Sequence, residues 1–243
     1  MRVSPQLLVV TVAVLVLAAW MADWLVSRGP AIAQQPRGFP EQLVVSAGHG
    51  GGLAMLGGLR PAMASACWLQ ANLAWERRDL AGTVEMIELT VATDERPLYF
   101  WLNGARILAC DMPEWRTTPL MPAALRGQIA EEQAQHALEF LEKGLRWRGP
   151  AADLYIEMAN IHLRRRADVA QAARFYRLAA EQPDAPYFAG RIYAELLCSL
   201  GRPSEALAWL KHQLPDLPRN DPGARRDVVL ERIKALERTT AAP

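Results

Sequence analysis

The sequence predicts an all-α protein in which pairs of antiparallel helices repeat along the chain as a right-handed solenoid. Two observations favour this fold class. Residues 153–186 and 187–220 align without a gap as two 34-residue copies, and each copy holds two amphipathic stretches. Small and apolar residues of the two copies also fall in register. The matched positions are Ala159 with Tyr193, Asn160 with Ala194, Leu163 with Leu197, Ala172 with Ala206, and Tyr176 with Leu210.

The two amphipathic stretches of each copy are separated by a short break. The break lies near Ala167 and Asp168 in the first copy and at residues 200–203, Leu-Gly-Arg-Pro, in the second. A 34-residue period with two short helices per unit is typical of the tetratricopeptide (TPR) repeat. Residues 193–218, YAELLCSLGRPSEALAWLKHQLPDLP, resemble that family most closely: Ala194 and Ala206 are small, Gly201 suits the turn, and Pro218 closes the unit.

A transmembrane helix is expected at the N-terminus. Residues 7–26 are twenty predominantly apolar residues in which Asp23 carries the sole charge. At 1.5 Å per residue they span about 30 Å, which is enough to cross the hydrocarbon core of a bilayer. Trp20 and Trp24 lie near one end, where tryptophan favours the membrane interface. Residues 1–27 are therefore predicted to be a transmembrane anchor.

A cleaved signal peptide is the alternative, because residues 31–33 read Ala-Ile-Ala. The gap between the apolar core, which ends at Ala19, and Gln34 is long for a cleavage region, so an uncleaved anchor is favoured. The short flank before the span favours an inside N-terminus, which would place the repeats outside or in the periplasm. Residues 28–60, rich in proline and glycine, are interpreted as a tether.

Two degenerate units are expected before the clear copies. In residues 61–97, Pro61 opens a helix that carries Trp68, Asn72 and Trp75 on one face, and residues 80–93 form its partner. In residues 98–150, a helix over 98–110 and a long amphipathic helix over 123–146 are separated by an inserted loop, 111–122, with three prolines.

A capping helix is expected to close the C-terminal end. Residues 224–238 carry Val228, Val229, Ile233 and Leu236 on one side and many charges on the other. Solenoids need such a terminal helix with a polar outer face. Residues 221–243 are therefore predicted to be this capping helix and a short tail.

The TPR resemblance also implies a binding surface. In that family the first helices of successive units line a concave groove that receives a peptide or a partner helix. By register, the groove residues would include Tyr99, Arg106, Glu157, Ile161, Arg164, Arg191 and Glu195. Their charges are mixed, so no single clamp for a terminal carboxylate is expected.

Composition and motifs argue against several other classes. The net charge is +1, so no overall field favours nucleic acid. Only three of the 27 basic residues are lysine, a bias typical of a GC-rich, bacterial genome. Residues 48–52, Gly-His-Gly-Gly-Gly, resemble an oxyanion-hole loop, but no G-x-S-x-G motif accompanies them. An enzyme that uses this loop is a distant alternative, and no catalytic residue is assigned.

Metal and cofactor sites are not expected. The four histidines are isolated, and the three cysteines form no C-x-x-C pair. The cysteines are interpreted as buried small apolar residues, although Cys67 and Cys110 could pair in an oxidising compartment. The arginine runs 164–166 and 225–226 are explained by a solvated face, with an acidic peptide or anionic head groups as the alternative.

The sequence therefore favours a non-enzymatic, membrane-anchored scaffold of the bacterial cell envelope that binds another protein or a peptide. The alternative is an accessory subunit of a membrane complex, docked through the helix at residues 7–26. Neither a nucleic-acid partner nor a small-molecule substrate is expected.

Overall fold

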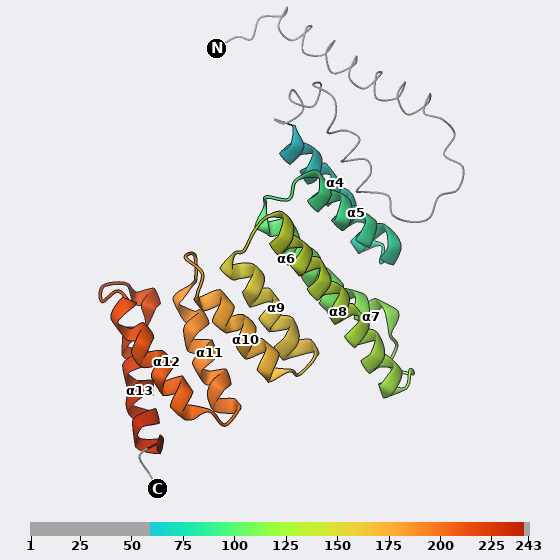
Figure 1. Ribbon diagram of the computed structural model, residues 1–243. Helices are drawn as coiled ribbons and strands as arrows, with labels where there is room; N and C mark the ends of the chain where they lie inside the picture. The colour runs from blue at the N-terminus through green and yellow to red at the C-terminus, as the bar shows by residue number, and fades with distance from the viewer. Residues whose placement is uncertain (1–58, 241–243) are drawn as a thin grey trace, which may run out of the picture. The chain divides into compact units, whose positions relative to one another are not determined.

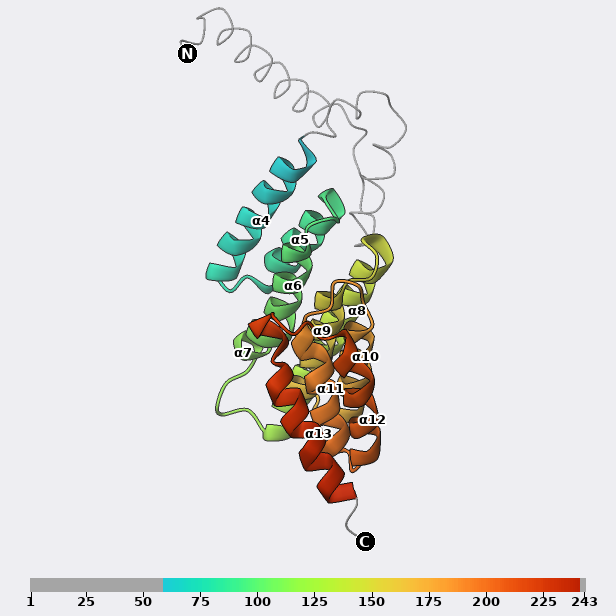
Figure 2. The ribbon, with the colours of Figure 1, turned by 90° about the vertical axis from the view of Figure 1, so that its left-hand side faces the viewer.

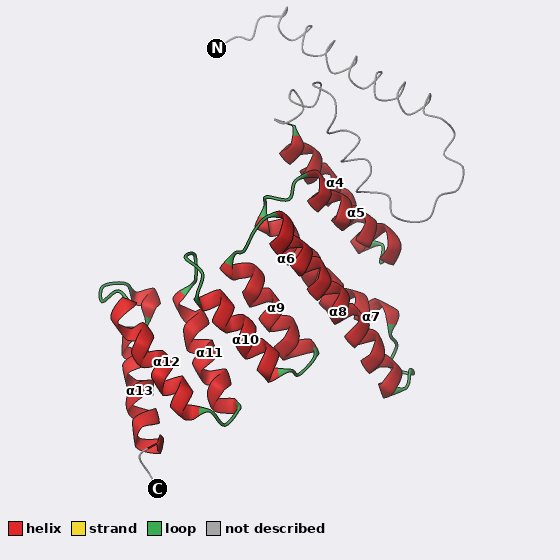
Figure 3. Cartoon of the chain, viewed as in Figure 1, coloured by secondary structure: helices red, strands yellow, loops and turns green. Residues whose placement is uncertain are grey.

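The computed structural model describes residues 59–240. The described residues are helical, with no β-strand among them, so the predicted all-α class is confirmed there (Figure 1, Figure 3). The α-helices are α4 (Arg60–Glu76), α5 (Leu80–Thr93), α6 (Leu98–Arg106), α7 (Met112–Arg116), α8 (Ala123–Trp147), α9 (Ala152–Arg165), α10 (Val169–Ala180), α11 (Tyr187–Ser199), α12 (Pro203–Gln213) and α13 (Arg226–Thr240).

Helices that follow one another in the chain pack against one another. Helix α4 packs on α5, α9 on α10, α10 on α11, α11 on α12, and α12 on α13, while α8 packs on α6 and α9 (Figure 1, Figure 2). The breaks within the two predicted copies lie where the sequence puts them, at residues 166–168 between α9 and α10 and at residues 200–202 between α11 and α12. Local contacts of this kind dominate a chain built from successive helical pairs.

The turns within three helical pairs share one backbone feature. The residue before the N-cap of the second helix is left-handed in each: Arg78 has a φ of 56°, Ala167 of 51° and Gly201 of 72°. The N-cap aspartates Asp79 and Asp168 each accept a hydrogen bond from the backbone N–H three residues later, which starts α5 and α10. Residues 60–93 therefore turn in the same way as the two clear copies.

Two sequence departures from the repeat pattern have structural partners. Asn160 accepts a hydrogen bond of 2.8 Å from the hydroxyl of Tyr176, whereas the matched residues of the second copy, Ala194 and Leu210, are both apolar. Gln213 lies directly against Gly190, where any Cβ would collide with the glutamine amide. Each larger or polar side chain is thus matched by a change in the residue that faces it.

The inserted loop is shorter than predicted. Instead of ending near Cys110, the helical segment continues through a π-helical turn, Ile107–Asp111, into α7. Pro113 is tolerated because it occupies the first turn of α7, where a backbone N–H is not needed. Residues 111–116 are therefore helical, and the loop is confined to residues 117–122.

The core is divided into two hydrophobic clusters that meet at α9. Leu154, Met158 and Ile161 of this helix belong to the first cluster, whereas Ile156 and Ala159 belong to the second. Helix α9 therefore contributes one face to each cluster.

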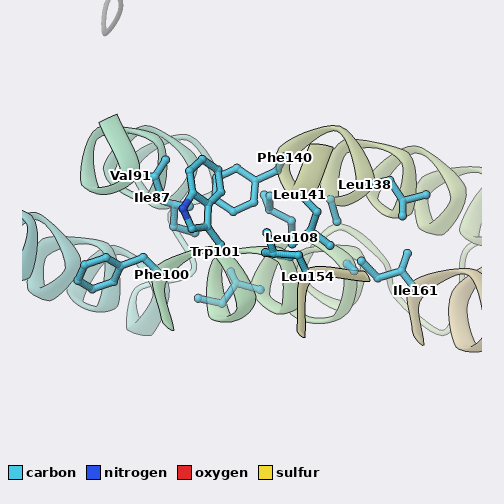
Figure 4. Packing of buried hydrophobic residues seen from close by; sticks show 14 of the residues in the cluster. Ile87, Val91, Phe100, Trp101, Leu108, Leu138, Phe140, Leu141, Leu154 and Ile161 are labelled. Carbon is cyan, nitrogen blue, oxygen red and sulfur yellow. The ribbon is translucent and has the colours of Figure 1, made fainter. Parts of the chain in front are cut away.

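Trp101 lies at the centre of the first cluster. It is fully buried, and its ring centroid is 4.8 Å from that of Phe140 (Figure 4). Its indole N–H donates to the backbone carbonyl of Glu95 at 2.7 Å, so the ring is buried without an unpaired donor. Gly144 leaves room for the ring, since a Cβ there would lie 3.0 Å from it.

The C-terminal helix packs as expected, with one exception. Val229, Ile233 and Leu236 are buried against the second cluster, but Val228 is exposed, so it does not belong to the inner face. The predicted span at residues 7–26 with Trp20 and Trp24, most of the tether, and the loop at residues 48–52 lie outside the described residues. Within residues 59–240, no helix combines the length and apolar character that a bilayer crossing requires.

Candidate functional site

A recess of about 610 Å³ opens between the segment formed by α6 and the π-helical turn and the neighbouring helix α9. Both segments begin a helical pair, as the predicted groove requires. Four of the seven predicted groove residues lie here, together with three that were not predicted. The lining residues are Arg106, Cys110, Glu157, Asn160, Ile161, Arg164 and Arg165.

An ion pair links the two sides of the recess. Glu157 is buried, with 7% of its surface exposed, and its carboxylate faces Arg106 of α6. Nε of Arg106 donates to Oε2 at 3.0 Å and Nη2 donates to the same oxygen at 2.8 Å. This hydrogen bonding raises the pKa of Arg106. A buried carboxylate requires such a partner, and the pair joins α6 to α9.

The rest of the polar lining consists of hydrogen-bond donors. Because Oδ1 of Asn160 is occupied by the Tyr176 hydroxyl, its Nδ2 amide remains to donate, and no described residue accepts from it. Arg164 and Arg165 form no ion pair with another described residue, whereas the adjacent Arg166 pairs with Glu131 at 2.5 Å. Donors of this kind suit a ligand rich in carbonyl or carboxylate oxygens.

Three predicted groove residues do not reach the recess. Tyr99 is more than half exposed and packs edge-on against Trp68, with ring centroids 5.6 Å apart. The guanidinium of Arg191 donates to the backbone carbonyl of Ala224 at 2.9 Å, and Glu195 accepts from Arg232 of α13 at 2.6 Å. Burial lowers the pKa of Arg191. The C-terminal segment therefore engages Arg191 and Glu195, and the assignment of these three residues to a partner groove stays a prediction.

Three recess residues were not predicted, and the sequence carries a different signal for each of them. Arg165 belongs to the arginine run at 164–166, and its place next to Arg164 was a usable signal. Asn160 differs in polarity from its match in the second copy, Ala194, but this difference does not indicate that it lies on a surface. Cys110 enters the lining through the π-helical turn, for which the sequence offers no periodic signal.

His162 is a buried titratable group beside the recess rather than in it. The imidazole is 6% exposed and stacks on Phe175, with ring centroids 5.2 Å apart and an interplanar angle of 16°. Its Nδ1 is buried and has no hydrogen-bond partner among the described residues. Burial, followed by the charge of Arg166, lowers the pKa of His162 from its ordinary value of 6.5.

The described part of the chain holds neither a metal-binding cluster nor a disulfide. Residues 59–240 contain no group of three or more histidine, cysteine, aspartate or glutamate side chains that could hold a metal ion. Cys67, Cys110 and Cys198 are free thiols, so the possible bridge between Cys67 and Cys110 is not formed. Comparison with protein-family models gave no match, and comparison with curated protein sequences gave none either.

Proposed function

We propose that this chain is a membrane-anchored scaffold whose helical pairs form a TPR-like solenoid and whose recess binds a segment of another protein. Support for the solenoid comes from consecutive helical packing, the shared left-handed turns, and the 34-residue register. Support for the anchor comes from the apolar run at residues 7–26. The proposal assigns no catalytic residue and no cofactor.

The observation that carries the binding proposal is the donor-rich lining of the recess. Arg164, Arg165 and the Nδ2 amide of Asn160 present donors that no described residue satisfies, beside an internally satisfied Arg106–Glu157 pair. Helix α9 is firmly packed on α8 and α10, so these side chains project from a rigid support. A peptide segment whose backbone carbonyls or acidic side chains lie in the recess would supply the missing acceptors.

Site-specific crosslinking tests this binding. A photoreactive amino acid replaces Arg164 in the recess or, as the matched control, the exposed Arg174 of α10, and intact cells are irradiated. We expect a discrete protein adduct from position 164, a several-fold weaker one from 174, and loss of the first when Arg165→Glu is added. An adduct that survives Arg165→Glu, or equal adducts from both positions, would contradict binding in the recess.

The anchor is tested separately, by intact mass and N-terminal sequencing of the protein recovered from the membrane fraction. We expect the chain to retain residues 7–26. A mature N-terminus at Gln34 would instead show a cleaved signal peptide and a released scaffold, and would remove the membrane from the proposal without affecting the recess.

A further inference from the structure

Helix α4 is apolar on its outer face as well as on its inner one. Its inner face buries Ala64, Trp68 and Ala71 against the first hydrophobic cluster. On the opposite side, the large apolar residues are exposed: Leu59 by 52%, Met63 by 51%, Leu69 by 63% and Leu73 by 42%. At about 100° per residue, they fall on one stripe with Ala62, Ala66 and Gln70.

This outer stripe is unusual for a helix at the end of a stack. A helix that faces solvent normally carries polar residues on its outer side, and an apolar helix surface is normally covered. Gln70 is the one polar residue of the stripe. The other end of the described chain is more polar: α13 buries Val229, Ile233 and Leu236, and although Val228 and Leu230 are exposed, charged residues such as Glu231 and Lys234 lie beside them on its outer side.

The segment that precedes α4 in the sequence is apolar enough to cover the outer stripe. Residues 41–58 enter α4 directly at Leu59, contain six large apolar residues and carry a single charged side chain, Glu41. Eighteen residues extend up to about 60 Å, more than twice the length of about 25 Å of a seventeen-residue helix, so the segment can run back along the whole of α4. The six residues are Leu43, Val44, Val45, Leu53, Met55 and Leu56.

Covalent attachment favours this segment over other occupants. A segment joined to the helix competes at an effective concentration in the millimolar range, which a separate copy or partner does not normally reach. A lipid surface fits less well, because helices that lie in a membrane interface pair their apolar face with a polar face rich in lysine and arginine. The face of α4 opposite the stripe is instead packed on α5, and Arg60, the one basic residue of the helix, pairs with Glu95.

We propose that residues 41–58 fold back onto the outer stripe of α4 and cap the N-terminal end of the helical stack. The tether predicted for residues 28–60 would then be shorter, ending near Pro40. The inference does not depend on the recess or on what binds there.

Disulfide trapping in the full-length chain, reconstituted in lipid nanodiscs, tests this contact. The three native cysteines are replaced by serine, and single cysteines are scanned through residues 43–56, each combined with Leu69→Cys. The matched control pairs each scanned cysteine with Arg174→Cys, which is also exposed but lies on α10. We expect an intramolecular disulfide at one or more scanned positions with Leu69→Cys, at a yield at least several-fold above the control.

Hydrogen exchange of the cysteine-free chain supplies a second readout. Amides in residues 41–58 should exchange at least tenfold faster when Leu69→Asp and Leu73→Asp place charges on the stripe, while amides of α10 are unchanged. Disulfide-linked dimers through Leu69→Cys would show that a second copy covers the stripe. Equal yields with the control, or exchange in residues 41–58 that does not respond to the two aspartates, would also overturn the proposal.

Discussion

The turn between α9 and α10 allows a single substitution to test the repeat register directly. Ala167 is exposed and left-handed, with a φ of 51°, and the matched residue of the second copy is Gly201, with a φ of 72°. The left-handed conformation costs a residue with a Cβ about 1–2 kcal/mol, whereas it costs glycine little. Ala167→Gly removes that cost.

The gain is reduced by the greater freedom of glycine in the unfolded chain, which opposes it by about 0.4–1 kcal/mol. We therefore expect Ala167→Gly to raise the free energy of unfolding by about 0.5–1 kcal/mol. For a folded region of this size, such a change corresponds to a Tm increase of about 1–4 °C. The reciprocal change, Gly201→Ala, should lower the stability by a similar amount. A Cβ at Gly201 would meet no other atom within 4 Å, so this effect reports the backbone alone.

Thermal unfolding followed by circular dichroism, with urea unfolding as a check on the slope, measures both variants. A higher free energy of unfolding for Ala167→Gly together with a lower one for Gly201→Ala would establish that the two turns are equivalent. A loss of stability with Ala167→Gly, or no change with Gly201→Ala, would refute the argument that these residues share one strained conformation.

Three further predictions concern side chains. Tyr176→Phe should cost about 1 kcal/mol and Asn160→Ala about 1–3 kcal/mol, and the double variant should cost less than their sum, because each single change leaves one half of the same hydrogen bond unpaired; urea unfolding measures all three. Gly144→Ala should destabilise the chain by about 1–2 kcal/mol, because the added methyl group presses on the buried indole of Trp101. In the same helix, a Cβ at Gly127 meets no other atom, so Gly127→Ala should stabilise the chain by up to about 1 kcal/mol. The Tm of each variant measures both effects. The pKa of His162 is lower in the folded chain than in the unfolded one, so its contribution to the free energy of unfolding should be fully present above about pH 6.5 and should be lost as the pH falls below that value. Unfolding measured as a function of pH should no longer show this loss in His162→Phe. The loss should remain when the exposed histidine of α12 is replaced by glutamine.

The sequence was sufficient to predict the helical pairs where both local and repeated patterns agree. The breaks at Ala167 and Gly201 and the small residues at Ala172 and Ala206 have physical causes that act within a few residues or between neighbouring helices. They are therefore visible in a periodic pattern. The lining of the recess was predictable only in part, because the repeat register assumes that every first helix exposes the same positions.

The remaining features depend on contacts that periodicity does not encode. Gln213 could be placed only once Gly190 was known to face it, and Arg191 only once the chain after α12 was seen to return to α11. The prolines around Pro113 suggested a loop because proline usually ends a helix. They did not reveal that the preceding π-helical turn lets Pro113 begin a new one.

That π-helical turn has a consequence for how this segment tolerates insertion and deletion. A single π turn inside a helix corresponds to one residue more than an α-helix needs. Losing one codon from a helix normally rotates everything beyond it by about 100°. Within residues 107–111, the same loss would instead place Pro113 in the interior of a continuous α-helix, which proline disfavours, and would turn Trp115 away from Trp75, whose ring centroid now lies 6.2 Å from it. The extra residue thus allows the segment from α6 to α7 to contact α4 through Trp115 and to line the recess through Arg106 and Cys110.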